Sequence, residues 1–96
     1  MKLEWSVFAL ADRDDIFSFI ESDNPRSAIK VDDAIRAHVE RLATFPESGR
    51  IGRVAGTREL VITGLPYIVG YRITADAVRI LRVLHGAQPW PDSLPK

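Results

Sequence analysis

Apolar and polar residues alternate at the N-terminus and predict a β-strand there. Residues 2–7 read "KLEWSV", and a period of two is typical of a strand with one buried face. Residues 9–22 read "ALADRDDIFSFIES", in which Ile16 and Ile20 are four positions apart. This spacing places both side chains on one face of a helix. Three acids fall early in the segment, where a helix dipole favours negative charge: Asp12, Asp14 and Asp15.

A second helix is predicted from residue 25 to about residue 45. Asn24 suits its N-cap and Pro25 its first helical position. Its apolar positions recur every three or four residues and form one stripe: Ala28, Val31, Ile35, Val39 and Leu42. Because the turn before this helix is short, the two helices should form an antiparallel hairpin.

Three further strands are predicted in the second half of the chain, at residues 58–63, 67–73 and 77–85. Residues 46–57, "PESGRIGRVAGT", should form a loop because glycines interrupt them. Residues 86–96 contain three prolines and should be irregular. The element order is β-α-α-β-β-β. We therefore expect a single α+β domain over residues 1–96, with the helical hairpin packed on one face of a mostly antiparallel sheet.

The last hairpin allows its register to be predicted. If Ala75 and Asp76 form a two-residue loop, the residue numbers of the two partners in each cross-strand pair add up to 151. Tyr71 and Ile80 then lie on an apolar inner face that also carries one misfit, Arg82. On the outer face Arg72 lies opposite Arg79, and His85 lies further along. Adjacent guanidinium groups repel each other unless both reach solvent or share an anion.

Composition narrows the classes of function. Cysteine is absent and there are only two histidines, so we expect no disulfide, no metal site and no cofactor. No apolar run is long enough to span a membrane, and early acids argue against a signal peptide, so a cytoplasmic protein is expected. Residues 1–48 hold six bases and ten acids, and residues 49–96 hold seven bases and three acids. The two halves are therefore −4 and +4, which favours either an anionic partner or mutual attraction of the halves.

The basic residues of the second half, together with one tryptophan, are candidates for binding a target or an anion. They are Arg50, Arg53, Arg58, Arg72, Arg79, Arg82 and Trp90. The alternative for the arginines is an ordinary solvated surface. Trp90 stands between two prolines. It should either fold the tail back onto the sheet or anchor a partner.

Three stretches in this order resemble the RelE/ParE family of bacterial toxins from type II toxin–antitoxin systems. They are "GRIGRVAGTRELVI", "PYIVGYRI" and "VRILRVLHGAQPWP", preceded by the β-α-α order and by the pattern from Asp12 to Ile20. The resemblance covers nearly the whole chain and depends on the set of stretches, since no single motif is diagnostic. It implies a toxin that a cognate antitoxin holds inactive.

Members of this family differ in their target. RelE-like members are ribosome-dependent endoribonucleases that cleave messenger RNA. ParE-like members resemble them in fold but inhibit DNA gyrase and are not enzymes. The nuclease pattern has lysines on the strand before "PY" and an arginine after the next tyrosine. Here residues 58–63 contain no lysine and Ile68 follows Tyr67. A net charge of zero also disfavours binding to ribosomal RNA. The ParE-like branch is therefore favoured.

Two alternatives remain open. The chain could be a RelE-like endonuclease with His85, Arg72 and Arg79 as catalytic residues, or a non-toxic protein-binding relative. For the antitoxin, the expected contacts are apolar residues that a thin core cannot bury. They are Phe8, Leu10, Phe19 and Ile29.

Overall fold

Two helices form an antiparallel hairpin, as predicted. The computed structural model describes all 96 residues, and its helices are α1 (Val7–Glu21) and α2 (Pro25–Glu40). The Asn24 side chain caps α2 by accepting a hydrogen bond from the backbone of Ser27, and Pro25 occupies the first turn. Helix α1 begins earlier than predicted because Ser6 caps it. The first turn of α1 therefore holds no acid, which corrects the expectation for Asp12, Asp14 and Asp15.

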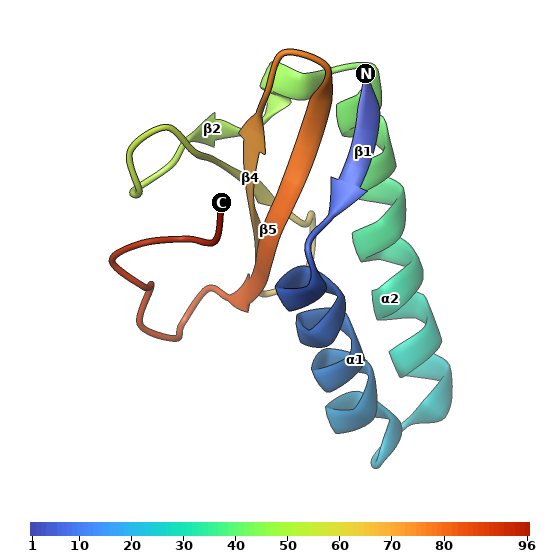
Figure 1. Cartoon of the computed structure of the whole chain (residues 1–96). Coiled ribbons are helices and arrows are strands. Elements are labelled where there is room, and N and C mark those ends of the chain that lie inside the picture. Colours follow the sequence, from blue (N-terminus) through green and yellow to red (C-terminus); the bar gives the residue numbers. More distant parts are fainter.

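A five-stranded sheet covers one side of the hairpin, as Figure 1 shows. Its strands are β1 (Lys2–Trp5), β2 (Arg50–Ile51), β3 (Arg58–Val61), β4 (Tyr67–Ile73) and β5 (Ala77–His85). Their order in the sheet is β1-β5-β4-β3-β2. Only β1 and β5 run parallel, and the other pairs are antiparallel. The expected α+β architecture is confirmed, except that the predicted loop of residues 46–57 contains the two-residue strand β2.

The predicted register of the β4–β5 hairpin is correct near the turn and wrong beyond it. Tyr71 pairs with Ile80 and Arg72 with Arg79, as predicted. A bulge between Gly70 and Tyr71 then shifts the pairing by one residue, so that Gly70 lies opposite Arg82. Beyond a bulge, side chains that were assigned to one face belong to the other.

The core lies between the inner face of the sheet and the hairpin. Tyr71 and Ile80 are fully buried in it, and Ile35 and Val39 of α2 pack against them. Arg72 and Arg79 belong to the opposite face and are half-buried. The prediction of an apolar inner face and an arginine-bearing outer face is therefore confirmed for this part of the hairpin.

The C-terminal tail is irregular, as predicted, and it folds back over the outer face. Trp90 is half-buried and the exposed fraction of Leu94 is only 8%. Both approach the backbone at Gly70, where a Cβ atom would lie 3.1 Å from Leu94 Cδ1 and 3.5 Å from Trp90 Cζ2. Of the two roles considered for Trp90, the structure shows the first, a side chain that holds the tail on the sheet. Neither helix is long and apolar enough to cross a membrane.

Candidate functional site

The outer sheet surface, defined here as Arg50, Arg53, Arg72, Arg79 and Trp90, gathers most of the residues predicted to bind a target. Strands β2, β4 and β5, the loop before β3 and the tail contribute to it. Its organising residue is Glu59 on β3, which the sequence did not single out and whose exposed fraction is 2%.

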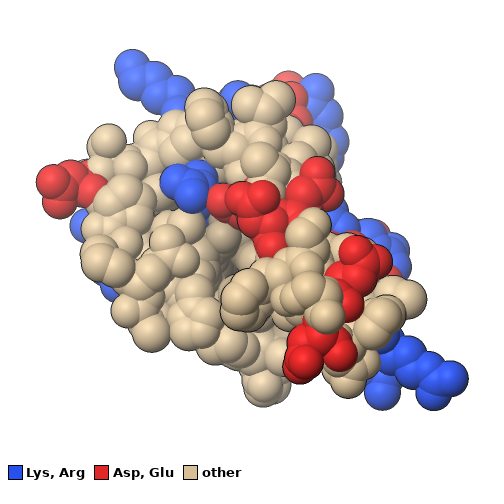
Figure 2. All heavy atoms as spheres, turned by 90° about the horizontal axis from the view of Figure 1, so that it is seen from below, with Lys and Arg blue, Asp and Glu red and all other residues tan.

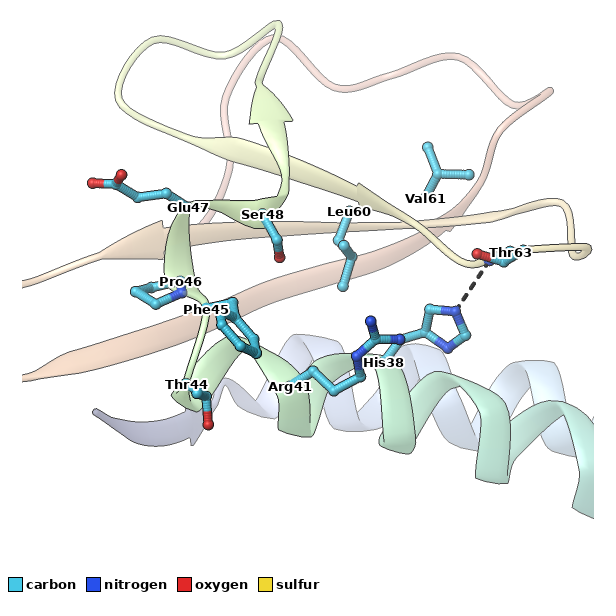
Figure 3. Close-up of a pocket in the computed structure, with 10 residues that line it drawn as sticks. All are labelled: His38, Arg41, Thr44, Phe45, Pro46, Glu47, Ser48, Leu60, Val61 and Thr63. Carbon is cyan, nitrogen blue, oxygen red and sulfur yellow. Dashed lines mark hydrogen bonds between the residues drawn. The ribbon is translucent and has the colours of Figure 1, made fainter.

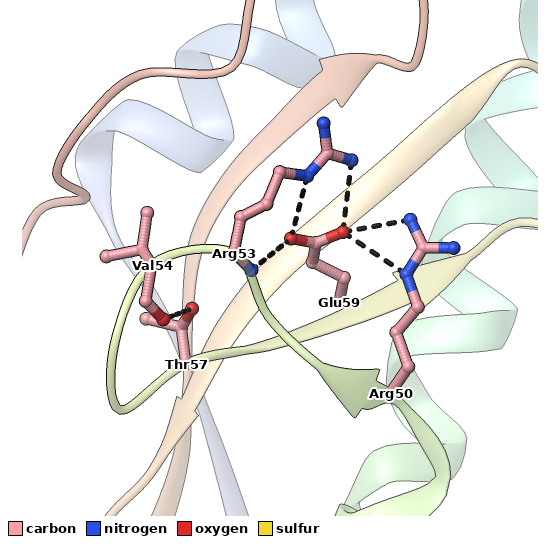
Figure 4. A network of polar contacts seen from close by, with 5 residues as sticks. All are labelled: Arg50, Arg53, Val54, Thr57 and Glu59. Carbon is pink, nitrogen blue, oxygen red and sulfur yellow. Dashed lines mark hydrogen bonds and ion pairs between the residues drawn. The ribbon is translucent and has the colours of Figure 1, made fainter.

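Glu59 binds two arginines, as Figure 4 shows. Its Oε1 atom accepts hydrogen bonds from Arg50 Nη2 at 2.9 Å and from Arg53 Nη2 at 3.1 Å. Its Oε2 atom accepts from the backbone N–H of Arg53 at 2.8 Å. Burial by itself would raise the pKa of Glu59, but the bonds from Arg53 and Arg50 outweigh it and lower the pKa from 4.5 to about 2. Glu59 therefore stays ionised and fixes both guanidinium groups in place.

The arginine–glutamate cluster is joined to the tail through Arg53. The guanidinium carbon of Arg53 lies 4.4 Å from the centre of the Trp90 ring, which is a favourable cation–π distance. Trp90 Nε1 is buried and has no hydrogen-bond partner within the chain. The loop before β3 and the tail thus meet at one point of the outer sheet surface.

Three more of the predicted arginines bind backbone carbonyl groups. Arg58 donates to the carbonyl of Gly49 at 2.9 Å, and Arg72 donates to that of Gly56 at 3.3 Å. Arg79 Nε donates to the carbonyl of Lys96 at 2.9 Å. Each guanidinium group has five N–H donors. These contacts therefore orient the arginines and still leave donors for a partner.

Arg82 is held by Asp12 of α1. It donates two hydrogen bonds to Asp12, with 2.7 Å between Arg82 Nε and Asp12 Oδ2. The same oxygen accepts from the backbone N–H of Val83. The hydrogen bonding to the Asp12 carboxylate raises the pKa of Arg82. Because of the bulge, Arg82 pairs with Gly70 and is not the inner-face misfit that the predicted register implied.

His85 is not placed with Arg72 and Arg79. The bulge pairs His85 with Tyr67, a core residue, and the two rings meet edge to face at 5.7 Å. His85 therefore follows the inner-face register, whereas the prediction placed it on the outer face. His85 lies six positions beyond Arg79 along β5, a span of roughly 20 Å at about 3.3 Å per residue. The Nδ1 atom of His85 accepts a hydrogen bond from the backbone of Ala87.

The apolar residues predicted to contact an antitoxin are all exposed. The exposed fractions are 54% for Phe8, 44% for Leu10, 79% for Phe19 and 53% for Ile29. They do not form one patch, since at about 100° per residue Phe8 and Leu10 lie about 160° apart around α1. Leu10 lies beside a cleft between the helices that Arg13 and Asp32 also line.

The surface around α1 is acidic. Five of the six charged residues between positions 12 and 23 are acids: Asp12, Asp14, Asp15, Glu21 and Asp23. Figure 2 views the molecule from the end where the helices meet, and it shows acidic side chains in a run beside a broad uncharged surface. The helix side of the molecule therefore differs from the arginine-bearing outer sheet surface in both charge and polarity.

Comparisons with known proteins agree on one class, the RelE/ParE-type toxins. Residues 3–90 match the model of the family "ParE toxin of type II toxin-antitoxin system, parDE". The chain is 45% identical over 93 residues to "Putative toxin Y4kP" from Sinorhizobium fredii, and the match covers 97% of this chain and 96% of that protein. It is 33% identical over 84 residues to "Toxin RelE2" from Caulobacter vibrioides, over 88% of this chain and 93% of that protein.

A solved structure gives the same result. It is described as "Chromosomal ParDE TA system from P. aeruginosa", and it superposes with a TM-score of 0.81 at 28% identity over 88% of this chain and 95% of that one. The chain belongs to the ParE family of type II toxin–antitoxin toxins. The resemblance found in the sequence, with its preference for the ParE-like branch, is confirmed.

Proposed function

We propose that this toxin inhibits growth by acting on DNA gyrase, without catalysing a reaction of its own. The observation that carries the proposal is the separation of His85 from Arg72 and Arg79. Cleavage of RNA requires an acid or base and the cations around the scissile phosphate to converge within hydrogen-bonding reach. A span of roughly 20 Å along one strand, with the histidine following the opposite face, does not provide that convergence.

The outer sheet surface is our candidate for the contact with gyrase. It offers pre-oriented guanidinium groups because Glu59 fixes Arg50 and Arg53, and Trp90 supplies a large apolar group beside them. Arginine and tryptophan are the residue types that contribute most at protein interfaces. Arg58 and Arg82 were also predicted to bind a target. We expect a smaller contribution from Arg82, because two of its donors are committed to the carboxylate of Asp12.

Messenger RNA cleavage on the ribosome is the second candidate function. The identity to "Toxin RelE2" and the exposure of His85 favour it, and its catalytic residues would be His85, Arg72 and Arg79. A non-toxic relative is the third alternative.

A pair of assays with the purified protein distinguishes the three functions. We expect inhibition of DNA supercoiling by gyrase and no arrest in a translating ribosome extract. Arg72→Glu should weaken the inhibition at least tenfold. Arg26→Glu is the matched control, because Arg26 is exposed on the first turn of α2 and has no ion pair. Arrest of translation with cleaved message, abolished by His85→Ala, would establish the nuclease instead, and inactivity in both assays would leave the non-toxic relative.

We also propose that a cognate antitoxin neutralises the toxin by covering α1 and the start of α2. Exposed Phe8, Leu10, Phe19 and Ile29 support this, and because Phe8 and Leu10 lie on different sides of α1, the antitoxin segment must wrap around the helix. The acids of α1 favour a segment that also carries basic residues.

Co-expression with the antitoxin, followed by affinity purification, tests this interface. Phe19→Glu should abolish recovery of the antitoxin, whereas Arg72→Glu on the outer sheet surface should not. Ile51→Glu is the matched control, since Ile51 is 75% exposed and lies at the opposite edge of the molecule. Loss of the antitoxin in Ile51→Glu but not in Phe19→Glu would contradict the proposed location.

A further inference from the structure

One edge of the sheet is only partly covered. Strand β2 pairs with Arg58 and Glu59 of β3 and with nothing further along that strand. The backbone N–H of Ile62 points towards β4, where it donates to Tyr67. Since backbone groups alternate in direction along a strand, the N–H and C=O groups of Val61 point away from β4, towards the open side. They are an unpaired strand edge, the kind of group that pairs with a strand from another chain.

A cleft of about 630 Å³ lies beside this edge, between β3 and the C-terminal end of α2. Figure 3 shows Leu60 reaching into the cleft from the strand, with Phe45 facing it from the connection that follows α2. Phe45 is 63% exposed and Val61 is 47% exposed. An extended chain laid along the edge would place an apolar side chain against Phe45 and Leu60.

His38 occupies the place that a partner's backbone would take. Its Nδ1 atom lies 2.7 Å from the carbonyl oxygen of Ala34, and its Nε2 atom accepts a hydrogen bond from the backbone N–H of Thr63 at 3.3 Å. Thr63 is two residues beyond Val61, so its N–H faces the same open side. The imidazole ring therefore satisfies the next edge donor, which leaves Val61 as the free one.

The charge of the cleft points to an acidic partner. Arg41 lies in the 3-10 turn after α2 (Arg41–Ala43) and is exposed. In Figure 3 its side chain extends beside His38 towards the strand, whereas the carboxylate of Glu47 is turned away from the other lining residues. Arg41 has no carboxylate partner, unlike the neighbouring Arg36, which pairs with Asp33 and Glu40.

We propose that this cleft binds an extended peptide segment of a partner protein that pairs with β3 at Val61. The segment carries an apolar side chain that packs on Phe45 and Leu60, followed by a carboxylate that meets Arg41. The site lies on a different part of the molecule from both the outer sheet surface and α1. It therefore does not depend on the identity of the target.

Titration of the ¹⁵N-labelled protein with a synthetic peptide tests the proposal. The probe is the acetylated amide of Thr-Val-Thr-Val-Asp-Asp, and the control peptide has Lys-Lys in place of Asp-Asp. We expect saturable shifts of the amide signals of Val61 and Thr63, with a dissociation constant of about 1 mM, equivalent to about −4 kcal/mol. The control peptide should bind at least tenfold more weakly.

Three variants make the test specific. Arg41→Glu should weaken binding of the acidic probe at least tenfold, whereas Arg26→Glu, with the same change of charge, should not. His38→Ala should strengthen binding severalfold because it frees the N–H of Thr63. Absence of saturable shifts at Val61 and Thr63, equal affinity for both peptides, or an unchanged affinity in Arg41→Glu would overturn the proposal. None of these outcomes bears on inhibition of gyrase.

Discussion

Glu59 provides the most direct test of how the outer sheet surface is stabilised. It is almost fully buried and binds both Arg50 and Arg53, so Glu59→Gln removes a charge that two cations require. The pKa of Glu59 is lowered from 4.5 to about 2. At about 1.4 kcal/mol for each pH unit, and with allowance for solvent screening of the half-exposed arginines, the charge contributes roughly 2–3 kcal/mol to the free energy of unfolding.

The stabilisation by Glu59 should decrease as the pH falls. A carboxylate whose pKa is lower in the folded state stabilises the fold above the pKa of the unfolded state, and the effect is lost as the pH falls through the folded-state pKa. The stabilisation by Glu59 should be complete above about pH 4.5 and absent below about pH 2. The difference between the wild-type protein and Glu59→Gln should therefore shrink across that window.

Urea unfolding at pH 7 and at pH 3 measures both effects. In a domain of this size, the loss at pH 7 corresponds to a fall of about 10–20 °C in Tm. Glu21→Gln is the matched control, because Glu21 is exposed, has no ion pair and lies at the end of α1. The reasoning is refuted if Glu59→Gln is within about 0.5 kcal/mol of this control at pH 7, or if the gap is unchanged at pH 3.

Two further substitutions test side-chain hydrogen bonds. Tyr71→Phe removes a hydroxyl that donates to the carbonyl of Pro46 at 2.7 Å and accepts from the N–H of Gly49 at 2.9 Å; we expect a loss of about 1–3 kcal/mol in urea unfolding. Burial raises the pKa of Tyr71 above its usual 10.0. This tyrosine therefore stabilises the fold below about pH 10, and the stabilisation should fade at higher pH. An ultraviolet titration in which both tyrosines ionise normally would contradict this expectation. Asp12→Asn weakens the paired bonds to Arg82 and should cost about 1–3 kcal/mol, and an unfolding curve identical to that of Asp15→Asn would contradict this.

The helices and the two faces of the sheet were predictable because they follow from side-chain periodicity. The spacing of Ile35 and Val39 and the cap at Asn24 determine α2 locally, and the structure confirms both. The pairing of Tyr71 with Ile80 followed from the shortest turn that could join the strands. These features depend on residues close in sequence, where propensity and pattern act together.

The bulge was not predicted, because an alternating pattern does not say where one residue is inserted. Its one local signal is Gly70, since a glycine within a strand often marks a bulge or a close approach by another segment. In this chain it marks both, because Trp90 and Leu94 lie against it. Because the bulge was missed, His85 was assigned to the same face of the sheet as Arg72 and Arg79. That assignment mattered, since these three residues were the candidates for a catalytic site.

The hydrogen-bond partners of the arginines could not be predicted from the sequence either. Arg82 reaches Asp12 across 70 positions of the chain, and no local rule connects them. Arg50 and Arg53 are nearer to Glu59 in the sequence. A glutamate in a strand is nevertheless expected to be exposed unless its cationic partners are known. The direction of long side chains depends on tertiary contacts, so the sequence could name candidate arginines without showing what holds them.

The pairing of the first strand with the last has a consequence for synthesis of the toxin. Strand β1 pairs only with β5, with Lys2 opposite Ala77, and Ser6 bonds to Ile80 and Leu81. During translation β1 must remain without its neighbour until the residues of β5, Ala77–His85, have left the ribosome. A message that ends before codon 77 therefore yields a product with an unfinished sheet, and a nonsense mutation in that part of the coding sequence should silence the toxin instead of producing a shortened active form.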